Sequence, residues 1–293
     1  MNLFTLGGIK IGSTVIKGIQ DSNLNNALEE ILLAGDGNPD PTFAAIGKLN
    51  PAIDFTTMAI KIALGACGIK GCTLAAAEMN LCRLENLAVR KSGSFQFKGT
   101  VVGGFLVPVS LSVSKFGAAT LKYRGVLLSA DGSAMPIALT PTGAVLSGEG
   151  EVTEAYTLGP VSINGQTLDN VEGFDIDFGI KTEETWPNGL ILPTDSSIMT
   201  RTPKITIKTT DVVNTITLGI AGAAQSASDS TLQLIDITKG GARGSSPITF
   251  SIDDGRISFN NIGASHGQKA MTGIIITPVS DMVNDIIAIT GLT

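Results

Sequence analysis

The feature that most constrains this chain is an internal repeat with a period of 152 residues. Residues 5–7 and residues 157–159 both read Thr-Leu-Gly. Six of the seventeen positions from 41 to 57 are identical to those from 193 to 209, and two of these are prolines. A single repeat pair of domain size predicts two tandem copies of one fold, residues 1–150 and 151–293, rather than a solenoid.

The repeat continues beyond these segments with a slip of two residues. In this register four pairs align, namely Gly117 with Gly267, Leu121 with Met271, Val126 with Ile276, and Ile137 with Ile287. The matched positions are mostly apolar, as expected for residues that occupy equivalent places in two cores.

Composition favours β-structure and disfavours several functions. Gly, Thr, Ser, Ile and Val are abundant, aromatic residues make up 5% and charged residues 16% of the 293 positions. This composition is typical of strands, and each half is long enough to bury a core. A net charge of −6, without a cluster of Lys or Arg, disfavours a sequence-reading nucleic-acid binder, which needs a basic face.

The sequence offers no candidate membrane span. The longest apolar segments, residues 101–113 and 273–279, are shorter than the 18 or so residues that a membrane helix needs. The N-terminus also lacks the basic, apolar and cleavage regions of a secretory signal. We therefore expect a soluble protein that is made in the cytoplasm and has no membrane partner.

The cysteines are confined to the first half. An odd number of them (Cys67, Cys72 and Cys82) without a signal peptide argues against a disulfide framework. The only histidine, His266, is distant in sequence, so a metal site would lack ligands. We expect free, mostly buried thiols and no bound metal.

Comparison of the two copies decides one ambiguous element. Residues 23–32 have the propensity and capping pattern of an amphipathic helix. Their counterpart, residues 171–182, alternates apolar and polar side chains with the period of two that a half-buried strand requires. Because homologous copies share a fold, we expect a strand in both places.

Each predicted strand is followed by a long segment rich in turn-forming residues, residues 34–50 and 183–202. Loops of this length inside a compact domain are usually functional or extend outward. Each loop leads into a short strand, residues 52–56 and 204–209, and then into a helix.

The helices have candidate caps at both ends. The first is expected at residues 58–64 after Thr56 or Thr57, and the second at residues 212–216 after Thr210 or Asp211. Glycines that could end them follow, at positions 65 and 219.

The rest of each half is typical of strands and hairpins. Asn164-Gly165 predicts one tight turn, and residues 253–255 predict another, joining strands 248–252 and 256–259 as a hairpin. The expected architecture is therefore mainly β: two tandem β-sandwich or partly open barrel domains, each with one short α-helix.

No catalytic constellation emerges from the remaining polar residues. His266 lies in a polar segment and is interpreted as a solvated residue rather than a base. Asp175 and Asp177 are interpreted as solvent-facing charges on a strand rather than a metal or glycosidase pair, and Asp253 and Asp254 as part of a turn rather than a calcium loop. We expect no enzymatic activity and no cofactor.

The order of elements, a strand, a long loop, a strand opening into a single helix, and then further strands, resembles that of phage tail tube (major tail) proteins. The resemblance rests on six segments, residues 41–47 (PTFAAIG), 51–57 (PAIDFTT), 104–111 (GFLVPVSL), 174–180 (FDIDFGI), 192–194 (LPT) and 201–211 (RTPKITIKTTD).

This resemblance implies a structural role in a virion. Such domains form stacked rings of six around a lumen that carries DNA, so a two-domain subunit would close a ring as a trimer with pseudo-sixfold symmetry. The expected partners are other copies of the chain and the tape-measure, terminator and baseplate proteins of the tail. DNA would pass without sequence-specific contacts, and an acidic lumen would not retain it.

The resemblance also implies that the two long loops reach the neighbouring ring. The candidate ring-stacking residues are Asp36, Asn38, Asp40, Trp186, Asn188 and Asp195. For Trp186 two interpretations stay open at this point, because it could anchor a partner or tuck under its own loop.

Two other functions remain as alternatives. One is a tail terminator, distal ring or baseplate hub protein that uses the same domain. The other is a tandem β-sandwich binding module or adhesin, for which one Trp and two Tyr offer few aromatic platforms.

Overall fold

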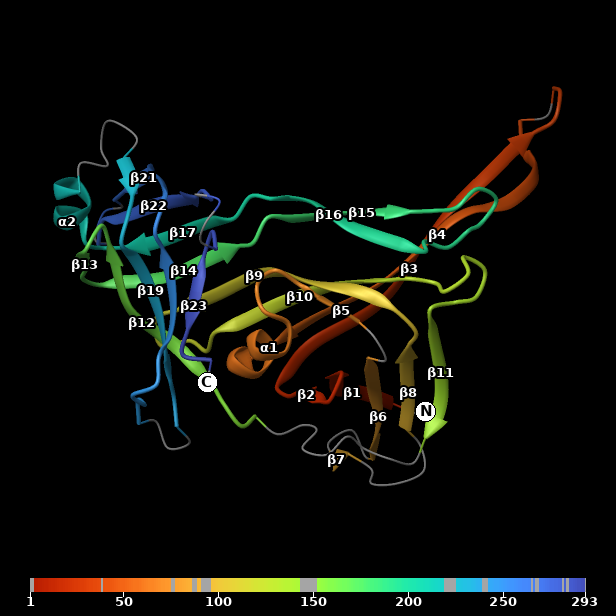
Figure 1. The fold of residues 1–293 in the computed structure, drawn as a ribbon, viewed down its shortest axis with the longest axis horizontal. Coiled ribbons are helices and arrows are strands. Elements are labelled where there is room, and N and C mark those ends of the chain that lie inside the picture. The colour runs from red at the N-terminus through yellow and green to blue at the C-terminus, as the bar shows by residue number, and fades with distance from the viewer. Residues whose placement is uncertain are drawn as a thin grey trace.

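Strands form most of this protein. The computed structural model describes residues 3–292 except 38, 75–76, 86–88, 91–95, 143–151, 219–224, 239–241, 265, 267–268, 281 and 283–284. In this part of the chain antiparallel sheets predominate, accompanied by two short helices, α1 (Ile60–Cys67) and α2 (Val212–Thr217) (Figure 1). The expected mainly β class is confirmed.

The largest sheet has ten strands and runs through both halves of the sequence. Its order is β18-β21-β22-β17-β14-β9-β10-β4-β3, with β5 paired to β9 beside this path. The two halves meet where β9 pairs with β14. The strands are β3 (Ile19–Ala34), β4 (Pro41–Thr57), β5 (Cys72–Thr73), β9 (Gly104–Ser114), β10 (Thr120–Leu127), β14 (Val171–Asp177), β17 (Lys204–Thr209), β18 (Gln225–Ala227), β21 (Gly255–Gly263) and β22 (Met271–Pro278).

Three smaller sheets complete the fold. The first has the order β11-β8-β6-β1-β2 with β7 beside β6, the second has the order β13-β12-β19-β20-β23, and the third is the hairpin β15-β16. Their strands are β1 (Leu3–Ile11), β2 (Thr14–Ile16), β6 (Glu78–Glu85), β7 (Val89–Arg90), β8 (Gln96–Val101), β11 (Ile137–Thr142), β12 (Tyr156–Ile163), β13 (Gln166–Leu168), β15 (Ile180–Thr185), β16 (Asp195–Arg201), β19 (Ser230–Asp236), β20 (Ile248–Ile252) and β23 (Ala288–Thr290).

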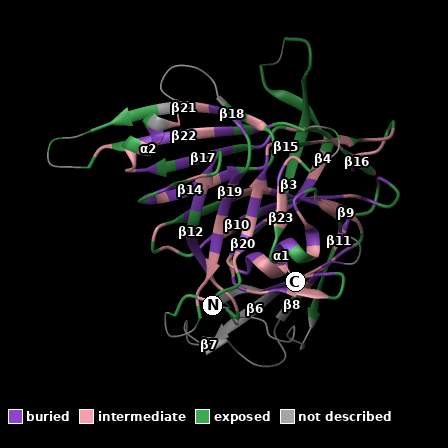
Figure 2. Ribbon diagram, turned by 60° about the vertical axis from the view of Figure 1, so that its left-hand side comes forward, coloured by how far each residue is buried: buried purple, intermediate pink, exposed green. Residues whose placement is uncertain are grey.

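The core lies where the strands turn their apolar faces inward (Figure 2). Phe55 and Tyr123, from neighbouring strands of the large sheet, are almost fully buried, and their ring centroids stack at 5.4 Å. In the second half, Phe174 and Phe250 are buried in the same way. Apolar burial of this extent is the main source of stability for such a fold.

The strand pairings of the first half recur in the second. In the small sheets Ile9 lies opposite Ile16, and Val161 lies opposite Leu168, a shift of 152 in both strands. The small-sheet order β2-β1-β6-β8-β11 has its counterpart in β13-β12-β19-β20-β23, and within the large sheet β3-β4-β10-β9 has its counterpart in β14-β17-β22-β21.

One detail of the expected alignment is wrong. The irregular pairing between β9 and β10 recurs between β21 and β22 with a shift of 151, so Leu121 occupies the position of Thr272 rather than Met271. By the same pairings Val126 corresponds to Thr277 rather than to Ile276. Burial agrees with this register at the first pair, because Leu121 and Thr272 are buried whereas Met271 is 46% exposed. At the second pair only the backbone pairing sets the register, because Val126 is buried and Thr277 is exposed. Apolar identity alone cannot fix a register when successive residues alternate between faces.

The predicted strand at residues 23–32 is confirmed. The one predicted at residues 171–182 is confirmed as far as Asp177, where β14 ends, and residues 180–182 belong to β15. The two predicted long loops are wrong. Residues 41–50 belong to β4, which pairs along β3, and residues 183–202 contain the hairpin of β15 and β16. Among the described residues of these two segments, those outside the strands lie at the hairpin ends, at 35–40 and 186–194.

The helix ends differ in part from the expectation. Asp211 caps α2, its carboxylate accepting a 3.1 Å hydrogen bond from the backbone N–H of Asn214. Helix α1 continues past Gly65 and ends at Cys67, and its C-cap is Gly68, whose φ of 62° suits glycine. Gly219 lies outside the described residues.

One of the two predicted hairpins forms. At the Asn164-Gly165 turn both residues have positive φ, as a tight two-residue hairpin requires. The hairpin expected around residues 253–255 is wrong, because β20 pairs with β19 and β23 whereas β21 pairs with β22 and β18. This turn therefore carries the chain from one sheet to another.

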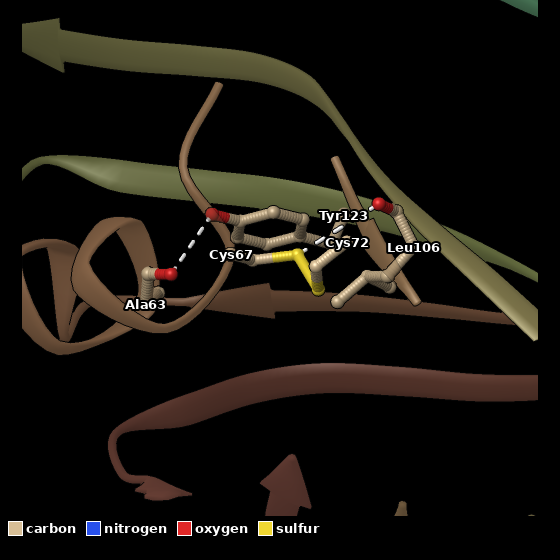
Figure 3. Close-up of a disulfide and its surroundings, with 5 residues drawn as sticks. All are labelled: Ala63, Cys67, Cys72, Leu106 and Tyr123. Carbon is tan, nitrogen blue, oxygen red and sulfur yellow. Dashed lines mark hydrogen bonds between the residues drawn. A yellow bond between two sulfur atoms is a disulfide. The ribbon is translucent and has the colours of Figure 1, made fainter. Parts of the chain in front are cut away.

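Two cysteines that were expected to be free form a disulfide, Cys67–Cys72 (Figure 3). Cys67 ends α1 and Cys72 begins β5, which places their Cα atoms 5.0 Å apart. The odd number of cysteines did not exclude this bridge, because two of three cysteines can pair and leave the third one free. The expectation for the Cys82 side chain lies outside the described residues.

Candidate assembly surfaces

The most prominent exposed feature is the hairpin of β3 and β4, whose outer part projects from the body (Figure 1). We call residues 26–50 the arm. Its apolar side chains are about half exposed: Leu28, Ile31, Leu32, Leu33, Phe43 and Ile46. Leu32 and Leu33 are consecutive and therefore point to opposite faces of the hairpin. Exposed apolar surface of this kind marks sites of interaction.

The base of the arm is held by the second half of the chain. The indole N–H of Trp186 donates to the carbonyl of Leu49 at 3.3 Å, and the N–H of Leu49 donates to the carbonyl of Ile191 at 2.7 Å. The Lys48 ammonium lies 5.2 Å from the centroid of the Trp186 ring. Of the two interpretations of Trp186, packing within the chain is therefore the one that the structure supports.

The six candidate stacking residues lie in two places. Asp36 and Asp40 are exposed at the tip of the arm, and Asn38 between them lies outside the described residues. Asn188 is exposed in the connection between β15 and β16, and the carboxylate of Asp195 accepts from the N–H of Ser196 at 2.9 Å. Pro41 and Leu49 are eight positions apart along β4, a length of about 27 Å, so the two groups do not form one site.

The sequence interpretation missed the apolar side chains of the arm. Leu28, Ile31 and Leu32 were expected in a half-buried strand, and Phe43 and Ile46 in a loop, because glycine, proline and aspartate precede them. The adjacent leucines at 32 and 33, followed by Phe43 and Ile46, could have indicated an interaction surface, because a solvated loop rarely carries so many apolar side chains.

A second surface is formed by the two ends of the large sheet. The order of strands ends with β3 on one side, and with β21 and the short β18 on the other. In the described part of the chain, β18 covers β21 only from Gly255 to Ile257 and leaves residues 259–263 unpaired on that side. Open strand edges pair readily with other strands.

The junction between the two halves of the chain, where β9 pairs with β14, shows how such an edge pairs with another strand. Strand β14 pairs with β9, from Gly173 opposite Ser114 to Asp177 opposite Ser110. The ladder is extended by two backbone hydrogen bonds, from the N–H of Lys115 to the carbonyl of Glu172 at 2.7 Å and from the N–H of Phe178 to the carbonyl of Val109 at 3.0 Å.

Side chains reinforce this junction on both faces. On the buried face, Leu111 and Ile176 lie opposite each other and are inaccessible to solvent. On the exposed face, Asp175 accepts from the hydroxyl of Ser112 and lies 3.6 Å from the Lys208 ammonium. Lys115 and Glu172 form a further ion pair at 3.3 Å.

The segment that connects the two halves is tied to the first helix. The carboxylate of Glu154 accepts a 3.0 Å hydrogen bond from the backbone N–H of Ile62 near the start of α1. Burial raises the pKa of Glu154, and hydrogen bonds from the backbone of Ile62 and Lys61, together with the Lys61 charge, offset part of that rise. Helix α1 is thus capped from outside, because Ala59 at its own N-cap provides no side-chain cap.

The polar residues considered for chemistry make structural contacts or lie at the surface. Asp175 belongs to the junction, and the carboxylate of Asp177 accepts from the N–H of Gly179 at 2.9 Å. His266 is exposed. Within the described ranges there is no group of three His, Cys, Asp or Glu side chains that could hold a metal ion, and no described helix has the length and hydrophobicity to cross a membrane.

No protein-family model matches this chain, and no curated protein sequence matches it significantly.

Proposed function

We propose that this chain is a structural subunit that assembles into the rings of a phage tail tube, and that its two halves arose by duplication of one tube domain. The observation that carries the proposal is the continuous large sheet, in which four strands of the first half are followed by their four counterparts in the second half. A junction of this kind can be repeated between chains. Repetition of one head-to-tail contact closes a ring when its rotation permits.

The number of units follows from the duplication. If a ring holds six domains, three chains complete it with pseudo-sixfold symmetry. The net charge of −6 per chain suits a channel for DNA, because it does not retain phosphate. In this proposal the protein resides in the virion tail, between tape-measure protein inside and terminator and baseplate proteins at the ends.

The arm supplies a means of stacking. Its apolar residues are exposed on both faces in the single chain, and a neighbouring ring would cover them. Asp36 and Asp40 would then make contacts at the tip, whereas Trp186 would hold the base of the arm in place.

Electron microscopy of the purified protein tests the proposal. We expect hollow tubes whose end views show three subunits and six lobes. Single rings would favour the terminator, distal-ring or baseplate alternative, and a monodisperse monomer at high concentration would contradict ring assembly.

A variant of the arm separates stacking from ring formation. Leu32→Asp with Leu33→Asp places charges on both exposed faces of the arm, and we expect single rings instead of tubes. Leu28→Ser is a milder control on the same strand and should leave tubes intact. Tubes of normal length in the double aspartate variant would rule out stacking through the arm.

A further inference from the structure

We infer that the two open edges of the large sheet fit each other, so that β3 of one copy pairs with β21 of the next copy as β14 pairs with β9 within the chain. The inference rests on the proposed assembly into rings and names the strands and the register that would join one subunit to another. The partner is a second copy of this chain, because the edge that β14 covers in the first half has its counterpart in the second half.

The edges of β9 and β21 are each partly covered by a short strand at the same position, which supports their equivalence. In the first half the short strand β5 pairs with β9 at Phe105 and Leu106 and leaves the following residues to β14. In the second half β18 pairs with β21 at Gly255–Ile257 and leaves residues 259–263 open. Residues 261–263 of this open segment correspond to residues 110–112 in the paired segment of β9.

The register can be derived from the internal shifts. Each residue of β9 corresponds to the residue of β21 that is 151 positions later, and each residue of β3 to the residue of β14 that is 152 positions later. The second shift also matches the register irregularity of β3 beside β4 with that of β14 beside β17. Transferring the pairing of Leu111 with Ile176 places Ile262 opposite Leu24 of the next copy. Transferring the pairing of Ser110 with Asp177 places Asn261 opposite Asn25.

Burial at the two edges is consistent with this register. Leu111 and Ile176 are fully buried where the halves join. In the single chain Leu24 is only half-buried and Ile262 is 47% exposed. Pairing the edges would cover both side chains and remove apolar surface from water, which favours association.

The charges of the two junctions differ in a systematic way. Three carboxylates of β14, those of Glu172, Asp175 and Asp177, are replaced on β3 by the amides Gln20, Asn23 and Asn25, whereas Gly173 is replaced by Asp21. Strand β3 would therefore bring one carboxylate to the junction between chains, where β14 brings three to the junction within the chain. Because residues 259–263 of β21 carry no charge, chains that each have a net charge of −6 can approach without like charges facing each other across these strands.

Disulfide trapping tests the register. The backbone hydrogen bonds of Lys115 with Glu172 and of Phe178 with Val109 place Ser110 and Asp177 at a non-hydrogen-bonded pair, where side chains approach closely. Asn25 and Asn261, the transferred pair, are both exposed in the single chain. In Asn25→Cys with Asn261→Cys we expect mild oxidation to give covalent dimers and trimers on a non-reducing gel.

Two matched variants serve as controls. Asn26→Cys with Asn261→Cys moves one thiol to the opposite face, so cross-linking should fall at least tenfold. Asn25→Cys alone should give no covalent dimer above the wild type, which retains its native cysteines. Efficient cross-linking of the single variant would show that β3 pairs with β3 and would overturn the inference.

The same samples distinguish this inference from the proposed function. Rings in the microscope without cross-links in the double variant would overturn the β3–β21 pairing and leave ring assembly standing. Cross-links in the double variant without rings would support the pairing and count against the tail-tube proposal.

Discussion

At the scale of single residues, two threonines play matched structural roles. The hydroxyl of Thr57 donates to the carbonyl of Lys17 at 2.7 Å and accepts from the N–H of Ala59 at 3.0 Å. The hydroxyl of Thr209 makes the corresponding bonds with Asp169 and Asp211, both at 3.0 Å. Both threonines are fully buried. Each one ties the end of a strand to the start of the following helix.

We predict that Thr57→Val and Thr209→Val each lower the free energy of unfolding by about 1–3 kcal/mol, because buried backbone groups lose their partner. Thr56→Val is the control, since Thr56 is only half-buried and lies on the other face of the strand. Urea unfolding followed by circular dichroism measures the difference. Equal stability of Thr57→Val and Thr56→Val would contradict this role.

The sequence identified both threonines as part of the repeat, and Thr57 also as a candidate cap of the first helix. Thr57 and Thr209 are one of the six identities between residues 41–57 and 193–209, but identity does not tell whether a residue is buried or bonded. The hydrogen bonds join residues 40 positions apart, and contacts at that range depend on how the strands are arranged. The disulfide was not predicted for a similar reason. Its two cysteines come together because α1 ends at Cys67 and β5 begins at Cys72.

At the scale of elements, the attachment of α1 to the connecting segment predicts a dependence on pH. The pKa of Glu154 is raised in the folded protein, mainly by burial. The contribution of this carboxyl to stability is therefore fully present below its ordinary pKa and is lost as the pH rises through the raised value. We predict that Glu154→Gln, which cannot ionise, gains stability relative to the wild type over this interval.

Urea unfolding at several pH values from 3.5 to 7 measures this effect, those values being chosen to span the ordinary Glu pKa of about 4.3. The difference between the variant and the wild type should grow with pH and then level off. Asp229→Asn, a change at an exposed turn residue, is the control. A difference that stays constant over the whole range would show that Glu154 has no raised pKa.

The elements differ in how far the sequence could predict them. Comparison of the copies identified β3 as a strand, because the alternation at Phe174 and Ile176 outweighed the helical propensity of residues 23–32. It could not predict that β3 and β4 continue into the arm. Strand patterns are recognised by one buried and one polar face, and on the arm Leu32 and Leu33 leave both faces apolar and exposed.

At the scale of the whole molecule, the open edges and the net charge predict how assembly depends on salt. Three chains of charge −6 carry −18 in total (3 × −6), so ring closure brings negatively charged chains together against their electrostatic repulsion. The inferred junction itself pairs amides and apolar side chains, so salt has few attractive charges to screen there. Raising the ionic strength shortens the screening length from about 10 Å at 0.1 M to about 3 Å at 1 M, and the dominant effect is weaker repulsion.

We therefore predict that assembly becomes more favourable as NaCl is raised, with rings appearing at lower protein concentration in sedimentation velocity. Asn25→Asp with Asn261→Asp puts two carboxylates opposite each other and should require more salt to assemble. Asn25→Asp with Asn261→Lys puts opposite charges there, so its assembly should gain less from salt than that of the wild type. Wild-type rings that dissociate as salt rises would mean that attractive ion pairs hold the subunits together, which the amide-rich edges of β3 and β21 do not provide.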